Sequence, residues 1–341
     1  MKVVFSQAHA LHRPRSFIKA GQVAPTPEIA ERATRIAAVL GESGFEFVAP
    51  REHGLAPILA VHDAGLVDFL SASYEAWKQL PGSSDEIVPN VHPGPRFRSR
   101  PTGIVGRVGY YTQDTACPIV AGTWEAVRAA AGCAAEAARL VCDGAGAAYA
   151  LCRPPGHHAT ADRAGGFCYL NNAAIAAQAL RAQCMRVAIV DIDVHHGNGT
   201  QEIFYDRGDV LFASIHGDPS GFYPFYSGNV DERGAGEGRG ANLNVPFPVG
   251  SGDTEVLAAF ANVMACVREF SAQAVVISLG FDAHEKDPHG AHKVTTAGFV
   301  QMAESLGKLG LPTVLVQEGG YLHDELGSLA RDFLVAFEGR A

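Results

Sequence analysis

The sequence lacks three features that would point to particular classes of protein. Charged residues are scarce, at 18% against 47% hydrophobic residues, which excludes a disordered or fibrous chain and leaves material for a sizeable core. An excess of positive charge is missing too: the formal net charge is -9, which argues against a nucleic-acid partner, because phosphates require a basic face. No apolar run has the length of a membrane helix or the flanks of a signal peptide, so we expect no membrane partner.

A cysteine framework is also missing. The seven cysteines are scattered and form no Cys-x-x-Cys pair. They are typical of reduced thiols in a cytoplasmic protein rather than of a disulfide-linked one. No internal repeat is visible at a fixed period, so a solenoid or propeller is not indicated.

Short β-branched runs alternate with Ala-rich helical patterns, which predicts an α/β fold with a mostly parallel sheet covered on both faces. The predicted strands are 3–5, 147–151, 187–191, 210–214, 243–245, 274–279 and 313–317. The predicted helices are 27–40, 64–77, 123–141, 172–183, 253–270, 295–309 and 326–337.

Two segments interrupt this alternation. Residues 80–121 are rich in Pro, Gly and Ser and too long for an ordinary loop, so we interpret them as a functional insertion. Residues 217–240 form a second long loop. Neither segment separates two self-sufficient cores, so residues 1–341 are predicted to form a single domain.

Four polar motifs follow or overlap the ends of predicted strands. They occupy residues 153–158, 191–197, 280–282 and 318–321. In open α/β sheets, ligands bind beyond the carboxyl ends of the strands. We therefore expect the four motifs to converge on one rim of the sheet.

One of these motifs is typical of a metal site. Asp191, Asp193 and His195 alternate along an extended segment, so their side chains can reach the same region. Asp282, at the end of an apolar run, supplies another carboxylate that is costly to bury alone. A catalytic zinc ion typically takes three protein ligands and leaves one position open.

Two histidines and a tyrosine complete the predicted chemistry. His157 and His158 could act as general base and acid near neutral pH, and each ring needs a partner to fix its tautomer. Asp191 and Asn198 are candidates for those partners. Tyr321 follows a Gly-Gly pair and could direct its hydroxyl at a developing oxyanion. His196, in contrast, is interpreted as a structural residue.

Together these motifs resemble the histone deacetylase superfamily, which includes bacterial acetylpolyamine amidohydrolases and other deacetylase-like amidohydrolases. The resemblance rests on RPPGHHA at 153–159, GGFCYLNN at 165–172, DIDVHHGNGT at 191–200, residues 280–282 and EGGY at 318–321. The insertion, with GYY at 109–111 and GTWEA at 122–126, looks most similar to the acetylpolyamine amidohydrolases.

The resemblance implies an arginase-like, three-layer α/β fold with an eight-stranded, mostly parallel sheet. The implied reaction is hydrolysis of a small N-acyl amide by metal-activated water. The implied metal is zinc, or ferrous iron in its place, and its ligands are Asp193, His195 and Asp282.

Particular roles follow from the same resemblance. It pairs His157 with Asp191 and His158 with Asn198, and it makes His158 the general base and acid. Tyr321 polarises the scissile carbonyl together with the metal.

A second cation and a substrate tunnel are implied as well. A structural potassium ion takes the Ser214 hydroxyl and the main-chain oxygens of Asp191, Asp193, His195 and Ile215. The tunnel is lined by Gly166, Phe167, Tyr223, His289 and Gly320. The resemblance further implies a homodimer in which the insertion narrows the mouth of the active site.

The insertion departs from the polyamine-specific pattern. Val105 and Ala116 stand where those relatives carry glutamates, and His289 replaces an apolar residue at the rim. The insertion also carries four arginines, Arg96, Arg98, Arg100 and Arg107. A basic entrance would disfavour a polycation through like-charge repulsion, unless these arginines are solvated or bind a partner subunit.

Several interpretations therefore stay open. The same chemistry could act on an acetylated polyamine, on another acetylated amine, or on neutral or xenobiotic amides such as anilides and organophosphorus amides. An arginase-type ureohydrolase would need a second metal and more bridging carboxylates. A non-catalytic module that binds acyl-amines would have no need for two histidines and a tyrosine at the metal.

Overall fold

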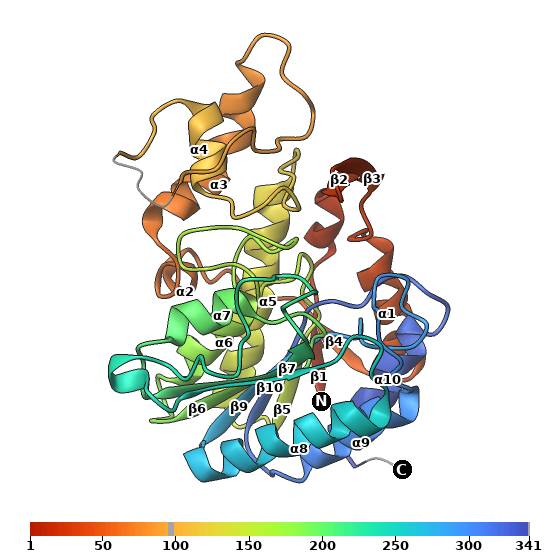
Figure 1. Ribbon diagram of the computed structural model, residues 1–341. Helices are drawn as coiled ribbons and strands as arrows, with labels where there is room; N and C mark the ends of the chain where they lie inside the picture. The colour runs from red at the N-terminus through yellow and green to blue at the C-terminus, as the bar shows by residue number, and fades with distance from the viewer. Residues whose placement is uncertain (95–98, 340–341) are drawn as a thin grey trace.

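A parallel sheet of eight strands forms the centre of the molecule (Figure 1). The computed structural model describes residues 1–94 and 99–339. The strand order is β4-β1-β5-β10-β9-β6-β7-β8, and each of these neighbours pairs in parallel. The strands of this sheet are β1 (Lys2–Val4), β4 (Glu46–Val48), β5 (Ala147–Ala150), β6 (Val187–Asp191), β7 (Val210–Gly217), β8 (Asn242–Phe247), β9 (Ala274–Leu279) and β10 (Thr313–Gln317).

Helices cover both faces of the sheet, which gives three layers (Figure 1). The helices are α1 (Glu31–Glu42), α2 (Ala56–Leu59), α3 (Ala64–Lys78), α4 (Ile104–Tyr110), α5 (Thr123–Cys142), α6 (Asn172–Leu180), α7 (Asn198–Phe204), α8 (Asp253–Phe270), α9 (Thr296–Gly307) and α10 (Leu326–Phe337). One hydrophobic cluster joins the sheet to α1, α8, α9 and α10, and a second joins it to α5, α6 and α7. The central strands are buried on both faces, as expected of a parallel sheet, and the predicted fold class is confirmed.

The four strands that precede the polar motifs are neighbours in the sheet. Their order, β5-β10-β9-β6, places four consecutive strand ends side by side. Because all four strands run in the same direction, their carboxyl ends form one edge. The predicted convergence of the motifs on one rim is therefore confirmed.

Several element predictions were wrong at their boundaries. The helix predicted for 27–40 begins at Glu31, because residues 27–30 form turns around the buried Glu28 carboxylate. That carboxylate pairs with Arg32 and Arg153, so burial of the ion pairs outweighs the helix-start signal at Thr26 and Pro27. The edge strand β4 was not predicted, because it has three residues and little alternation.

The described parts of the insertion, residues 80–94 and 99–121, contain more regular structure than their composition suggests. Helix α4 lies inside them, although two glycines lower its helix propensity. A third hydrophobic cluster packs this segment against α2, α3, α5 and α6 through residues such as Ile87, Val108 and Ile119. In Figure 1 this orange and yellow segment projects away from the sheet.

A hairpin that the sequence analysis did not predict also stands above the sheet (Figure 1). It consists of β2 (Ser16–Lys19) and β3 (Gln22–Pro25), which pair antiparallel. Glu86 of the insertion accepts hydrogen bonds from the Arg15 main-chain N–H and from the Ser16 hydroxyl at the base of the hairpin. The hairpin and the insertion are thus tied together.

The seven cysteines are free thiols, as predicted. Within the described ranges, no helix combines the length and apolar character needed to cross a bilayer.

The contact of α5 with α6 gives a test of the packing. Ala137 of α5 is fully buried in the second hydrophobic cluster, which is built largely from alanines. We expect Ala137→Leu to lower the free energy of unfolding by about 1–3 kcal/mol, because the added methyl groups find no space. Denaturant unfolding of this variant is compared with that of Ala129→Leu, a half-buried position on the same helix. Equal stability of the two variants would contradict tight packing at Ala137.

Candidate metal centre and catalytic site

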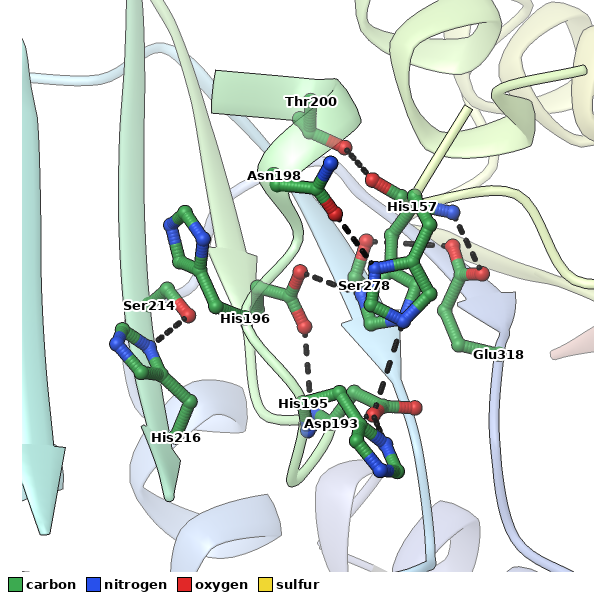
Figure 2. A network of polar contacts seen from close by, with 12 residues as sticks. His157, Asp193, His195, His196, Asn198, Thr200, Ser214, His216, Ser278 and Glu318 are labelled. Atoms are coloured by element: carbon green, nitrogen blue, oxygen red, sulfur yellow. Dashed lines mark hydrogen bonds and ion pairs between the residues drawn. The ribbon is translucent and has the colours of Figure 1, made fainter. Parts of the chain in front are cut away.

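Three side chains from two neighbouring strand ends meet at one point. The donor atoms of Asp193, His195 and Asp282 all lie within 4.8 Å of one another. The His195 Nδ1 atom is 3.2 Å from Asp193 Oδ1 and 3.2 Å from Asp282 Oδ2. Asp193 and His195 follow β6, whereas Asp282 follows β9, the strand that pairs with it. Figure 2 shows the Asp193 and His195 side chains close together.

The charges in this cluster favour a bound cation. Asp193 and Asp282 are buried, and their ion-pair partners among the described residues are the imidazoles of His157 and His195. Burial raises the pKa of Asp282, and the neighbouring Asp193 carboxylate raises it further. Two carboxylates and an imidazole nitrogen form a donor set that suits zinc or ferrous iron.

The backbone of the EGGY motif packs directly on the two carboxylates. The Gly319 N–H donates to Asp193 Oδ2 at 2.8 Å. A Cβ atom at Gly319 would lie 2.2 Å from Asp282 Oδ2 and 2.5 Å from Asp193 Oδ2. Glycine is therefore required there, because any side chain would displace the two carboxylates.

A second group of possible donors, His157, Cys168 and Glu318, is already engaged in other contacts. The Glu318 Oε2 atom accepts the main-chain N–H groups of Gly156 and His157, at 2.6 and 3.1 Å. Burial raises the pKa of the Cys168 thiol, which disfavours the thiolate that a metal needs. This group is better explained as a support for the loop that carries His157 than as a second metal site.

His157 lies against a carboxylate. Its Nδ1 atom is 3.0 Å from Asp191 Oδ2, and both residues are almost fully buried. Burial alone would lower the pKa of His157, but Asp193 and Asp191 outweigh it and raise the pKa to about 10. The arrangement favours a positively charged imidazole.

His158 has an amide partner instead. Its Nδ1 atom is 2.7 Å from Asn198 Oδ1. Burial and the neighbouring His157 and His195 rings hold the pKa of His158 well below its usual value. A neutral imidazole with Nδ1–H bonded to the amide oxygen keeps Nε2 free to accept a proton.

Tyr321 is buried close to Asp282, with 6% of its surface exposed. Its main-chain N–H donates to Asp287 Oδ2, and the Arg32 guanidinium lies over its ring at 5.0 Å. Burial and the Asp282 carboxylate raise the pKa of the phenol well above 10. The hydroxyl therefore stays protonated and remains a hydrogen-bond donor.

Aromatic rings surround the approach to these residues. The Tyr223 ring lies 4.9 Å from the His158 ring, and the Phe167 ring lies 6.2 Å from the Tyr321 ring. His289 is 5.0 Å from Tyr321 on another side. Three of the five predicted tunnel residues, Phe167, Tyr223 and His289, thus lie beside His158 or Tyr321.

The two glycines of the predicted tunnel have different contacts. A Cβ atom at Gly166 would lie 2.4 Å from His158 Cδ2, so the loop can approach the imidazole only with glycine at this position. The Gly320 carbonyl accepts a hydrogen bond from Arg32 Nε.

The residues predicted to bind potassium lie on β6, on β7 and in the loop after β6. Asp191 and Ser214 are partners in the register of the two strands, and Ile215 follows Ser214. The Ser214 hydroxyl is 2.8 Å from His216 Nδ1, and Figure 2 shows this pair beside the loop that carries His195 and His196.

His196 does not belong to the metal cluster. Its ring is fully buried, with Nε2 3.2 Å from Asn244 Oδ1, and it packs on Phe212. In Figure 2 the His196 and His195 rings project in different directions. The structure therefore fits the interpretation of His196 as a structural residue.

The sequence analysis missed several residues that shape the site. Phe222 stacks on the His195 ring at 4.9 Å, and Phe17 of the β2–β3 hairpin lies 5.5 Å from Phe167. Asp114 accepts hydrogen bonds from the Gly166 N–H at 2.9 Å and from the Tyr223 hydroxyl at 2.6 Å. None of these residues belongs to a local motif, so no sequence signal indicated its role.

Arg32 was missed as well, although it is buried beside the site. Its Nη1 atom donates to Glu28 at 2.8 Å and its Nη2 atom donates to the Glu318 carbonyl at 2.7 Å. It thus ties α1 to the loop that carries Tyr321.

Comparisons with known proteins agree with this geometry. The model of the histone deacetylase domain matches residues 26–337. An acetylpolyamine amidohydrolase of Burkholderia pseudomallei (strain 1710b) is 46% identical, over 99% of this chain and 98% of that protein. Acetylpolyamine amidohydrolase 1 of Pseudomonas aeruginosa is 44% identical over the full length of both chains.

Among solved structures, a crystal structure of acetylpolyamine aminohydrolase from Burkholderia pseudomallei superposes with a TM-score of 0.96. The two sequences are 46% identical, and the match covers 100% of this chain and 99% of that one. Because the domain model matches most of the sequence and these relatives match it end to end, the chain belongs to the histone deacetylase family of amide-bond hydrolases.

Proposed function

We propose that the chain is a zinc-dependent amidohydrolase that removes the acetyl group from a small acetylated amine, with acetylpolyamines as the favoured substrate class. One observation carries the proposal: Asp193, His195 and Asp282 converge beside two oriented imidazoles and a buried phenol. A non-catalytic module would not need this second group of residues.

The substrate class is supported first by the relatives, whose names state acetylpolyamines. A second support is a cavity of about 740 Å³ that adjoins the tunnel wall at Tyr223. It is lined by acidic and aromatic residues, among them Asp114, Glu202, Asp206, Tyr205, Phe225 and Tyr226. Carboxylates and aromatic faces attract ammonium groups, so a cationic tail that leaves the tunnel would be favoured here.

The arginines of the insertion oppose such a substrate less than their number suggests. Arg100 lies over the Tyr110 ring at 5.4 Å, with Nη2 3.9 Å from Asp63. Arg107 lies over Phe69 of α3 at 5.7 Å. Both charges therefore have partners within the α3–α4 region, whereas Arg96 and Arg98 lie outside the described residues. Neutral and xenobiotic amides are the less favoured alternative.

The metal would be held by Asp193, His195 and Asp282. A zinc ion bound there would supply Lewis acidity to the scissile carbonyl and to the attacking water. Ferrous iron in the same donor set would supply the same chemistry.

The protein groups would move the protons. His158 would take a proton from water through its free Nε2 atom and return it to the leaving nitrogen. His157, held by Asp191, would place positive charge beside the reacting centre. The Tyr321 hydroxyl would donate a hydrogen bond to the oxygen of the developing tetrahedral intermediate.

A structural potassium ion is proposed for the main-chain oxygens of Asp191, Asp193, His195 and Ile215 with the Ser214 hydroxyl. The strand register places Ser214 beside Asp191 in the sheet, which supports this donor set. Such an ion would stiffen the loop that carries the zinc ligands.

We also propose that residues 1–341 act as one catalytic domain and that two copies form a homodimer. The hydrophobic cluster that joins residues 80–121 to α5 and α6 supports treating the insertion as part of this domain. The insertion would shape the mouth of the tunnel and take part in the dimer contact.

A panel of substrates tests the proposed function. With the zinc-loaded enzyme, we expect the value of kcat/KM to be highest for acetylputrescine, lower for an acetyl-lysine peptide and lowest for acetanilide. The protonated amine of acetylputrescine gains contacts that acetanilide lacks. Preference for acetanilide would support the neutral-amide alternative, and urea release from guanidino substrates would support a ureohydrolase.

If Asp282 is a metal ligand, replacing its carboxylate with an amide should remove the metal. Asp282→Asn replaces a charged donor with a neutral one, so we expect zinc content far below one per chain and loss of turnover. Elemental analysis of the purified protein measures the zinc, and Asp231→Asn at an exposed position serves as the matched control. A variant that still binds one zinc per chain would contradict the assignment.

Tyr321→Phe should lose activity as well, but without losing the metal. We expect full zinc content and a fall in kcat of roughly two to three orders of magnitude, because a preorganised donor to the oxyanion is removed. Tyr74→Phe, on α3, is the control for the same substitution elsewhere. Turnover near that of the unmodified enzyme would remove the phenol from the mechanism.

A further inference from the structure

Gln113, near the end of the insertion, reaches into the catalytic site. Its Nε2 atom donates a hydrogen bond to the main-chain oxygen of His158 at 3.0 Å. Its Oε1 atom accepts a hydrogen bond from Asn198 Nδ2 at 3.2 Å. Asn198 Oδ1 in turn contacts His158 Nδ1, so the three residues form a closed ring that runs through both the main chain and the side chain of His158.

The main-chain oxygen of His158 sets the direction of all the hydrogen bonds in this ring. A main-chain carbonyl oxygen can only accept, so the Gln113 amide must turn its nitrogen toward His158. Its oxygen then faces Asn198, which must present its own nitrogen to Gln113 and its oxygen to the imidazole. The proton of His158 is thereby held on Nδ1, and Nε2 is left as the acceptor.

Asn198 alone would not define this arrangement. The oxygen and nitrogen of a side-chain amide are similar in size, so the two orientations differ mainly in their hydrogen bonds. With the amide reversed, an N–H group would face Nδ1 of His158, and the proton would move to Nε2. His158 could then no longer take a proton from water. His157 has no such ambiguity, because the Asp191 carboxylate only accepts.

The position of Gln113 is itself well determined. Its main-chain N–H donates to the Ala164 carbonyl at 2.7 Å. Its side chain packs over Gly165, where an added Cβ atom would lie 3.2 Å from three Gln113 atoms. The amide is thus held against the loop that precedes Phe167.

We propose that Gln113 is a positioning residue that fixes the tautomer of His158 by orienting the Asn198 amide. The proposal rests on the proposed function, because it assigns the proton acceptor of that reaction. It also gives the insertion a role in the chemical step, in addition to the wall of the tunnel.

Gln113→Met tests the proposal, since it keeps the length of the side chain and removes both hydrogen bonds. We expect kcat to fall roughly ten- to a hundredfold with little change in KM, because part of the general-base contribution is lost. Nitrogen-15 NMR of histidine-labelled, zinc-loaded protein should show the proton of His158 moving from Nδ1 to Nε2. The His158 signals are assigned by their loss in His158→Gln, and Gln301→Met, at an exposed position of α9, is the matched control.

A second variant, Asn198→Asp, distinguishes the loss of amide orientation from general damage to the site. Asn198→Asp replaces the amide with a carboxylate that accepts in either orientation, so Gln113 should no longer be needed to set the tautomer. In that background we expect Gln113→Met to change kcat by less than about twofold, a coupling that a double-mutant cycle measures. An equal loss in both backgrounds, or an unchanged His158 tautomer in Gln113→Met, would overturn the proposal.

The NMR measurement does not depend on turnover. If the unmodified enzyme hydrolysed no acetylated amine, the proposed function would fail, yet the position of the His158 proton would still decide the role of Gln113.

Discussion

The site depends on two carboxylates, Asp193 and Asp282, that are buried side by side at the ends of paired strands. Bringing two negative charges into the interior is costly unless a cation lies between them. Contacts from the surrounding chain offset part of this cost. Main-chain N–H groups of Val194, His195 and Gly319 donate to the two carboxylates, and imidazoles supply the ion-pair partners. In the proposed function a divalent cation held by these donors would complete this balance, and an amide carbonyl would react on the open side of the cluster.

The layers of the fold and the rim that holds the site could be predicted from the sequence. Long apolar runs and helical periodicities identify β6, β9, β10, α8 and α10 almost to the residue. The elements that were missed are those whose signal is not periodic. Strand β4 is too short, α4 contains glycines, and the start of α1 is displaced by the buried ion pairs of Glu28. In each case a tertiary contact decides the conformation, and a local pattern does not contain it.

The residues of the candidate site likewise fall into those that the sequence could predict and those that it could not. Asp193, His195 and the His157–His158 pair stand in compact motifs, so their convergence with Asp282 could be foreseen. Glu318 had no predicted role, because its contacts to the loop before His157 exist only in three dimensions. The sequence gives the number of arginines in the insertion but not the surface that each one faces. Arg100 lies over the Tyr111 ring and Arg107 over the Phe69 ring, and neither is among the residues that line the acidic cavity beside Tyr223.

The two imidazoles proposed to take part in catalysis, His157 and His158, show why the insertion matters beyond its effect on the entrance. A carboxylate partner fixes the tautomer of His157 without help, but it also draws positive charge onto the ring. An amide partner keeps His158 neutral, as a proton acceptor must be, at the cost of an ambiguous orientation. Gln113 removes that ambiguity from a position in residues 80–121. The segment proposed to shape the mouth of the tunnel therefore also contributes Gln113 to the hydrogen-bonded ring at His158, so a displacement of the insertion would alter kcat as well as KM.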